Sequence, residues 1–196
     1  IFIRSRLQLI GMTHGIMEYI LKNIKKYSKN EIKFVEREIK EIEKRYEASK
    51  IMYDYTCNNI SPDKSVSDKL MEANIIKSLS TDYTYEAART AQKLLGAKGF
   101  ESGHPMSNIA IDFRPFTIFE GPNDMLYADI YDQFSKATAE EKKMGIRINK
   151  DLTLYERFIS DKRFKVVSNS ADNLLQKADE VVNFLKNHTL NEIDQI

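Results

Sequence analysis

The stretch VSDKLMEANIIKSLSTDYTYEAARTAQKLLG, residues 66–96, decides the fold of this chain. Its apolar residues recur every three or four positions, which is the spacing of one face of an α-helix. The inward positions are Leu70, Ala73, Ile76, Leu79, Tyr83, Ala87, Ala91 and Leu94. The alanines allow another helix to approach closely, and Gly96 is a natural helix stop. The stretch therefore predicts a long helix over residues 66–95.

The same spacing occurs twice before this stretch. It predicts a first helix over residues 3–28, with Leu7, Ile10, His14, Met17, Leu21 and Ile24 inward. It predicts a second helix over residues 30–58, with Ile32, Val35, Ile39, Ile42, Tyr46 and Tyr53 inward. A loop at residues 59–63, which contains Pro62, separates the second helix from the third.

After Gly96 the pattern becomes irregular, because residues 97–119 contain two glycines and two prolines. A fourth helix is predicted over residues 122–131. Residues 136–150 read as a charged linker, and apolar residues then suggest a short helix at 152–159 and an amphipathic one at 171–185. We therefore predict an all-α fold, with an antiparallel, up-and-down four-helix bundle at residues 1–135 and a helical C-terminal extension at 136–196.

The composition limits the classes of function. The 196 residues include 30 basic and 29 acidic side chains, so bulk charge does not favour a nucleic-acid partner. The single cysteine, Cys57, excludes an internal disulfide and fits a reducing, cytoplasmic compartment. No run of 18 apolar residues predicts a membrane span, and no signal-peptide pattern is present. Because helical patterning begins at once after Ile1, with no initiator methionine, we expect a fragment or a processed chain.

Most groups of polar residues and glycines in the sequence do not indicate a binding or catalytic site. The three histidines, His14, His104 and His188, lie far apart and lack the spacing of metal ligands, so no metal site is predicted. We expect His14 to be a buried histidine whose hydrogen bonds are satisfied. The pair Gly96 and Gly99 is too short a signal for a phosphate-binding loop.

One carboxylate stands out, in the segment Ile118-Phe119-Glu120-Gly121-Pro122-Asn123-Asp124-Met125. Gly-Pro interrupts secondary structure, and Pro is tolerated in the first turn of a helix. Glu120 is therefore predicted to stand where an extended segment enters the fourth helix. A carboxylate between apolar side chains and the positive end of a helix can serve as a general base. The alternative is that Glu120 only helps to cap the helix.

The order of these features resembles the C-terminal domain of acyl-CoA dehydrogenases, over about residues 4–131. The resemblance rests on Arg6, Gly15 and Tyr27 of the first helix. It rests further on the alanine-rich third helix, on Leu94-Leu95-Gly96-Ala97-Lys98-Gly99-Phe100, on Asp112 and on Ile118-Phe119-Glu120-Gly121. Any one of these elements is a weak signal, whereas their order and spacing are specific.

The resemblance implies a role for each matched residue. Glu120 matches the base that removes the α-proton of a fatty acyl-CoA, and its backbone N–H matches a group that polarises the thioester carbonyl. Arg6 matches an arginine that contacts the CoA portion of the substrate. Gly96 and Gly121 match positions that line the FAD. The resemblance also implies an electron-transfer flavoprotein as electron acceptor and a homo-oligomer, a dimer or tetramer.

The chain departs from the family pattern at several points. The Arg-x-x-Phe-Gly motif is missing between the first two helices, and Ala97, Ile111 and Pro122 replace a glycine, an arginine and a threonine. The sequence also lacks the family's N-terminal helical domain and middle β-domain, so we expect this chain alone neither to hold FAD nor to catalyse the reaction. Two alternatives stay open: a non-catalytic helical oligomerisation or interaction module that has lost FAD binding, and a flavin oxidase.

Overall fold

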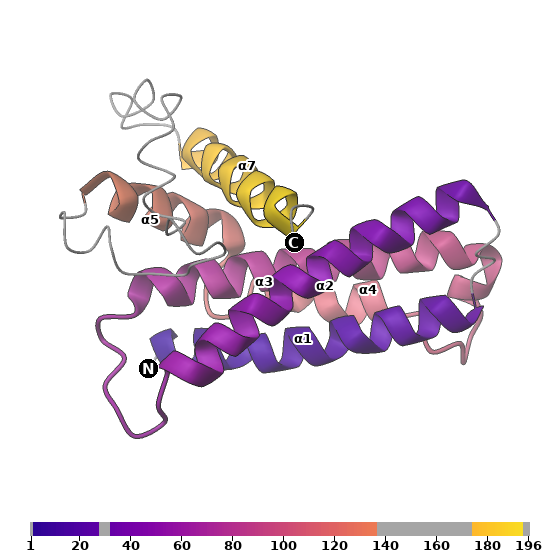
Figure 1. Cartoon of the computed structure of the whole chain (residues 1–196), viewed down its shortest axis with the longest axis horizontal. Coiled ribbons are helices and arrows are strands. Elements are labelled where there is room, and N and C mark those ends of the chain that lie inside the picture. The colour runs from indigo at the N-terminus through magenta and orange to yellow at the C-terminus, as the bar shows by residue number, and fades with distance from the viewer. Residues whose placement is uncertain (1, 28–31, 137–173, 194–196) are drawn as a thin grey trace.

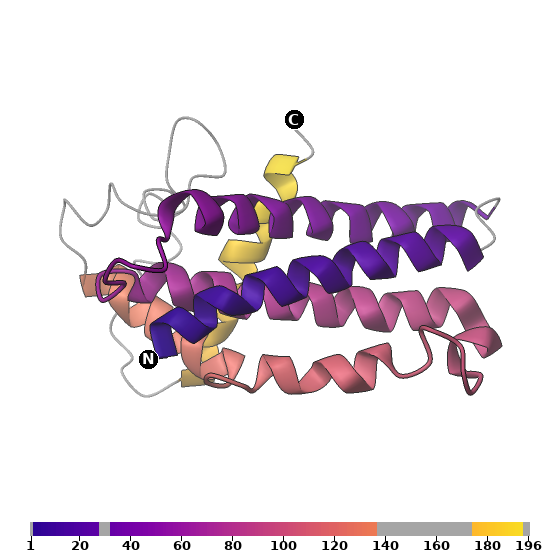
Figure 2. The same cartoon turned by 90° about the horizontal axis from the view of Figure 1, so that it is seen from below.

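The computed structural model describes residues 2–27, 32–136 and 174–193. All regular secondary structure within these ranges is helical, which confirms the all-α prediction. Three long helices, α1 (Phe2–Tyr27), α2 (Lys33–Asn59) and α3 (Leu70–Leu95), pack against one another. Figures 1 and 2 show them side by side, with successive helices running in opposite directions.

Helix α3 is the centre of the fold, because every side chain from Glu72 to Thr81 is buried. A helix that is buried on all sides is usually apolar on all sides. In α3 one face is apolar and packs into the core, whereas the other carries polar groups that find partners inside the protein. The polar residues of this second face that are fully buried are Asn74, Lys77, Ser78, Ser80, Thr81 and Thr84.

The segment after α3 runs back along that helix as the fourth row of Figure 2. It contains three short helical turns, η1 (Gly96–Phe100), α4 (Ile109–Phe113) and η2 (Arg114–Thr117), where the sequence predicted an irregular stretch. Gly99 permits the tight fold of η1 onto α3, since a Cβ at that position would lie 2.7 Å from the Gln92 carbonyl oxygen. The row ends beside the N-terminus of α1, where Glu120 follows.

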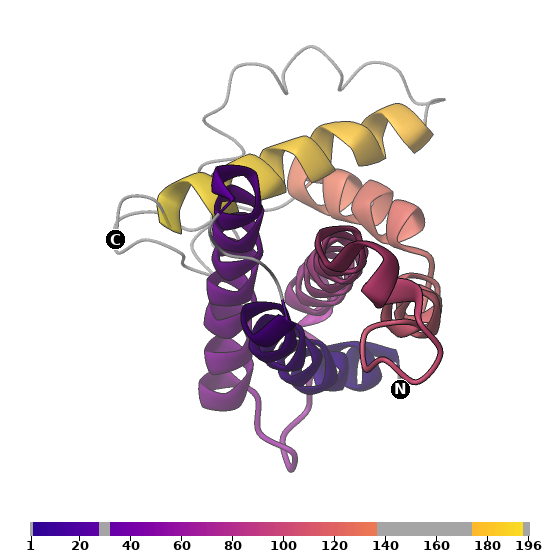
Figure 3. The same cartoon turned by 90° about the vertical axis from the view of Figure 1, so that its right-hand side faces the viewer.

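Two further helices complete the described structure. Helix α5 (Asn123–Lys136) packs on the N-terminal half of α3, and α7 (Leu174–Ile193) lies across α5 and α2 (Figure 3). The buried side chains of α7 are Ala178, Val181, Phe184 and Leu185. The segment 96–117 forms the fourth row along α3, so the predicted four-helix arrangement stays a prediction. The domain division at residue 135 also stays a prediction. The helix expected at 152–159 lies outside the described residues.

Helix boundaries differ modestly from those predicted. Helix α3 begins at Leu70 rather than at residue 66, because the chain first makes a turn in which the Lys69 amide donates to the Val66 carbonyl. Helix α5 continues to Lys136, beyond the predicted residue 131. None of the described helices combines the length and apolarity that crossing a membrane requires.

Candidate active site around Glu120

Glu120 has an unusual backbone conformation. Its φ angle is +60°, and it is the one non-glycine residue with positive φ among the described residues. Gly121 follows with φ +112°. The left-handed region costs a non-glycine residue about 1–2 kcal/mol. Contacts from elsewhere in the fold must therefore hold this turn, and two cations supply them.

Arg6 of α1 holds the turn from one side. Its Nε donates to the Glu120 carbonyl oxygen at 2.8 Å, and its Nη1 donates to Asn74 Oδ1 at 2.6 Å. Asn74 in turn donates from Nδ2 to Asp129 Oδ2 at 2.6 Å. A continuous chain of hydrogen bonds therefore connects α1, the Glu120 turn, α3 and α5.

The carboxylate of Glu120 accepts a hydrogen bond from Ser5. The Ser5 hydroxyl donates to Glu120 Oε2 at 2.8 Å. Ser5 also lines a groove of about 600 Å³ between the start of α1 and the loop before α3, together with Ile3, Arg4, Gln8, Ser65, Val66 and Ser67. Arg4 fixes the wall of the groove by donating to the Lys64 carbonyl at 2.8 Å. The carboxylate is thus bonded to a residue of the groove wall.

Lys77 of α3 also holds the turn. Its side chain is fully buried, and its Nζ donates to the Gly121 carbonyl at 2.7 Å, to Asn123 Oδ1 at 2.6 Å and to the Thr117 carbonyl at 3.3 Å. Burial lowers the pKa of Lys77 to about 8, and the positive charge of Arg6 acts in the same direction. The negative charges of Asp82 and Glu120 oppose this shift only in part.

The start of α5 is bonded to α3 through Asp82. Asn123 donates from Nδ2 to Asp82 Oδ1 at 2.7 Å, and the Tyr127 hydroxyl donates to Asp82 Oδ2 at 2.7 Å. Burial raises the pKa of Asp82, although these two hydrogen bonds lower it again in part. These hydrogen bonds therefore hold the start of α5, the helix that follows Glu120, against α3.

Three phenylalanines lead up to Glu120. Phe113 stacks on Phe116 with ring centroids 4.7 Å apart, and Phe116 meets Phe119 edge-on at 5.9 Å. Phe113 and Phe116 also line a second cavity, of about 380 Å³, with Ile16, His104 and Asp112 among its other walls. Ile118 and Phe119 are each 55% exposed. An apolar surface therefore lies immediately before the carboxylate in the chain.

Comparison with protein-family models identifies the chain. Residues 2–134 match the model described as acyl-CoA dehydrogenase, C-terminal domain. The chain belongs to this family. The match runs from the start of α1 almost to the end of α5, and it does not include α7. No curated protein matches the chain in a sequence comparison.

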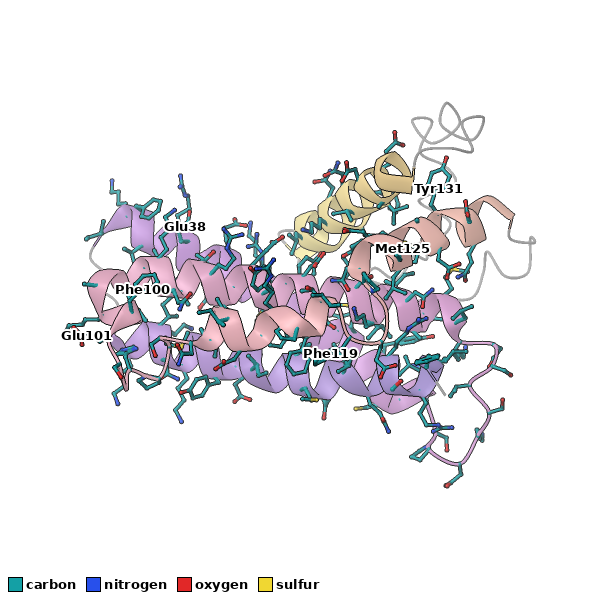
Figure 4. All side chains as sticks on the ribbon, turned by 180° about the vertical axis from the view of Figure 1, so that it is seen from behind. Glu38, Phe100, Glu101, Phe119, Met125 and Tyr131 are labelled. Atoms are coloured by element: carbon teal, nitrogen blue, oxygen red, sulfur yellow. The ribbon has the colours of Figure 1, made fainter. Side chains whose placement is uncertain are left out.

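The structure brings three of the four predicted site residues together. Arg6 lies against both Glu120 and Gly121, since a Cβ on Gly121 would come within 3.3 Å of Arg6 Nη2. Gly96 lies elsewhere. It ends α3, whereas Arg6 contacts Asn74 near the start of that helix. The separation of Asn74 and Gly96 by 22 positions corresponds to about 33 Å of helix. Figure 4 likewise shows Phe100, four residues after Gly96, well away from Phe119.

Gly96 and Gly121, the residues that the resemblance assigns to FAD, have different surroundings. A Cβ added to the exposed Gly96 would meet no atom within 4 Å, and neither of the two cavities described above is lined by Gly96 or Gly121. The need for glycine at position 121 has a local cause, the positive φ and the close approach of Arg6.

Departures from the family sequence pattern have visible structural counterparts. Ile111, which replaces an arginine, is 71% exposed. Lys93 replaces a glutamine, and its Nζ lies 5.1 Å from the centre of the Phe34 ring. The neighbouring Gln92 is turned inward, where its Nε2 donates to the Ser107 carbonyl and holds the loop after η1. Gln92 thus has a structural role and does not take the place of the missing glutamine.

Sequence reasoning missed the residues that hold the turn. Asn74, Lys77, Ser78 and Thr81 recur at helical spacing, so a polar stripe was visible beside the apolar one. That stripe is the signal that could have indicated a second buried face. Nothing in the sequence around Ser5 indicates that it contacts a residue 115 positions away.

His14 corrects one expectation. It is half-buried and stacked between Tyr46 and Tyr53 of α2, with ring centroids 4.9 and 5.0 Å apart. Its Nδ1 has no hydrogen-bond partner among the described residues, so it is not the satisfied histidine that the pattern predicted. Burial lowers its pKa. In the described part of the chain, no three His, Cys, Asp or Glu side chains are grouped as metal ligands would be.

Proposed function

We propose that this domain supplies the general base of an acyl-CoA dehydrogenase-like flavoenzyme, and that Glu120 removes the α-proton of an acyl-CoA thioester. One observation carries the proposal. Glu120 is held in a left-handed turn by Arg6, while its carboxylate is bonded to Ser5 in the wall of a groove. Membership of the family supports an oxidoreductase-like domain. The finer assignment rests on this geometry.

The chain's own groups divide the task between them. The Glu120 carboxylate accepts the α-proton, and the Ser5 hydroxyl orients that carboxylate by binding one of its oxygens. Arg6 binds the carbonyl of the same residue, so it fixes the backbone rather than neutralising the base. The Glu120 N–H polarises the thioester carbonyl, which makes the α-proton easier to remove.

The groove beside Ser5 is the place we assign to the CoA portion of the substrate. Its wall combines an arginine, Arg4, with the hydroxyls of Ser5, Ser65 and Ser67. Such groups suit phosphate, hydroxyl and amide groups on a ligand. Arg6 uses two of its nitrogens on protein acceptors. Its contact with CoA therefore stays a prediction.

Bound FAD would supply the acceptor for the hydride of the β-carbon, and an electron-transfer flavoprotein would be the expected electron acceptor. We propose that other surfaces of the complete protein or of a second subunit hold the cofactor. We propose Gly96 and Gly121 as open surface beside it, and a homo-oligomer as the active form.

The test is the Glu120→Gln variant of the complete protein. Glutamine keeps the shape of the side chain and removes the base, so exchange of the substrate α-proton with solvent and turnover should fall by roughly 10²–10⁴-fold. The matched control is Glu101→Gln, because Glu101 is an exposed glutamate at the other end of the molecule (Figure 4). Undiminished α-proton exchange in the Glu120→Gln protein would show that the base lies elsewhere.

A second candidate function is an interaction module without catalysis. Exposed apolar side chains favour it, because Ile111, Ile118, Phe119 and Met125 are all more than half exposed. Figure 4 shows Phe119 and Met125 at this surface. A complete protein that forms a stable oligomer, but neither contains FAD nor takes it up, would favour this function over the first.

A further inference from the structure

We infer that Lys77 is the positioning residue of the Glu120 turn, a cation that acts through the backbone to present the base. The inference rests on the proposed function, because it assigns Glu120 the role of base. Lys77 lies 43 residues before Glu120 in the sequence, on a different element. It does not donate a hydrogen bond to the Glu120 carboxylate.

The acceptors of Lys77 enclose the turn on both sides. The Thr117 carbonyl precedes Glu120, whereas the Gly121 carbonyl and Asn123 Oδ1 follow it. Drawing these three oxygens to one nitrogen folds the segment 117–123 back on itself. Arg6 of α1 holds the Glu120 carbonyl. The backbone around the base is therefore held between α1 and α3.

The number of bonds explains why this position suits a lysine. An ammonium has three hydrogens to donate and accepts none. The structure provides three acceptors, all neutral, and the side chain is fully enclosed. A shorter or apolar side chain would leave buried oxygens without donors, which is unfavourable. A glutamate or aspartate would repel them.

The enclosure of Lys77 also excludes other roles. A nucleophilic or Schiff-base lysine must be reached by its substrate, and Nζ of Lys77 is covered by protein. A purely stabilising role is disfavoured, because the negative charges of Asp82 and Glu120 offset the desolvation penalty of the buried Lys77 cation only in part. What the cation contributes is the position of the segment that carries Glu120.

The experiment uses the complete protein with its flavin and compares three variants with the wild type. Lys77→Met has a similar length and no donors, and Lys77→Gln keeps a neutral donor on a shorter side chain. The matched control is Ser80→Ala, because Ser80 is buried on the same helix and its hydroxyl bonds only to the Lys77 carbonyl of that helix. For each protein we would measure α-proton exchange, KM, flavin content and the melting temperature.

The inference predicts a specific pattern. Exchange should fall by about 100-fold in Lys77→Met, since a displacement of the order of 1 Å costs this much. It should fall by about tenfold in Lys77→Gln and stay unchanged in Ser80→Ala. KM and flavin content should stay unchanged in all three. A purely structural role would change the melting temperature without changing the exchange rate of the folded protein.

The contrary outcomes are distinguishable. A wild-type rate of α-proton exchange in Lys77→Met would overturn the inference and leave the proposed function intact. A loss of exchange in Ser80→Ala as large as the loss in Lys77→Met would have the same two consequences. If Lys77→Met does not fold, the exchange rate of Lys77→Gln decides in the same way. A wild-type protein that contains flavin and exchanges no α-proton overturns the proposed function, and the inference falls with it.

Discussion

The two halves of α3 use polar side chains for different purposes. Near its start, Asn74 accepts a hydrogen bond from Arg6, Lys77 donates to neutral oxygens, and together they shape the Glu120 turn. Farther along, Glu86 forms ion pairs with Arg45 of α2, at 3.2 Å, and with Lys186 of α7, at 2.5 Å. The first half positions a loop, and the second fastens two helices to α3.

The comparison shows why one glutamate is suited to chemistry and the other is not. Burial raises the pKa of Glu86, but its two cations outweigh burial and leave that pKa below its ordinary value. Around Glu120 the nearby cations Arg6 and Lys77 bind backbone carbonyls instead, and the carboxylate receives a hydroxyl. The two sites differ in the groups that their cations bind, and not in the number of cations.

The largest expected effect is on the half of the fold that holds α7. Leu185 is fully buried in α7, so Leu185→Ala should lower the free energy of unfolding by about 2–5 kcal/mol. Denaturant titration measures this change. The exchange rate of the folded variant should equal that of the wild type, and a parallel loss of exchange would mean that the two halves of α3 are not independent.

The Glu120 turn should respond to Gly121→Ala. A Cβ there would stand 3.3 Å from Arg6 Nη2 and from Leu126 Cδ2, at a φ of +112°. The unfolding free energy should fall by about 1–3 kcal/mol, and α-proton exchange should fall with it. Gly11→Ala is the control, because Gly11 lies within α1 with open space around it. That change should stabilise the protein by roughly 0.5–1 kcal/mol. Equal effects of the two changes would contradict a strained turn.

The pH dependence of stability should identify Lys77. Its pKa is about 8 in the folded protein and near 10.5 in the unfolded chain. Between these values the unfolded chain binds more protons, so stability should rise with pH by up to roughly 1 kcal/mol per unit. Urea titrations from pH 7.5 to 9.5 would measure this slope in the wild type and in Lys77→Gln. Lys77→Gln should lack this pH dependence of stability. The same slope in the wild type and in Lys77→Gln would mean that another group causes it.

The smallest effect should come from Glu86. Because its folded pKa lies below the ordinary 4.5, its contribution to stability is present above that pH and is lost as the pH falls further. Glu86 is about one-third exposed, so solvent limits the contribution to less than about 1 kcal/mol. Unfolding of the wild type and Glu86→Gln, compared at pH 6 and pH 3, should show a difference only at pH 6.

Sequence patterns predicted most of the helices, and the reason is visible in the residues. The apolar faces of α1, α2 and α3 follow helical spacing, and Gly96 ends α3 where a stop was expected. The short turns between Gly96 and Thr117 were not predicted, because their glycines and prolines favour many local conformations. The start of α3 was predicted four residues early, since a turn at Val66–Lys69 continues the helical spacing.

The sequence by itself determined the helical class, the order of the long helices and the carboxylate to examine, because periodicity and a Gly-Pro break are local signals. Only the tertiary structure decided what surrounds that carboxylate. Ser5, Arg6 and Lys77 lie 43 to 115 residues from Glu120 and reach it because α1 and α3 pack against the same turn. Contacts over such separations depend on how helices pack, and no local pattern encodes them.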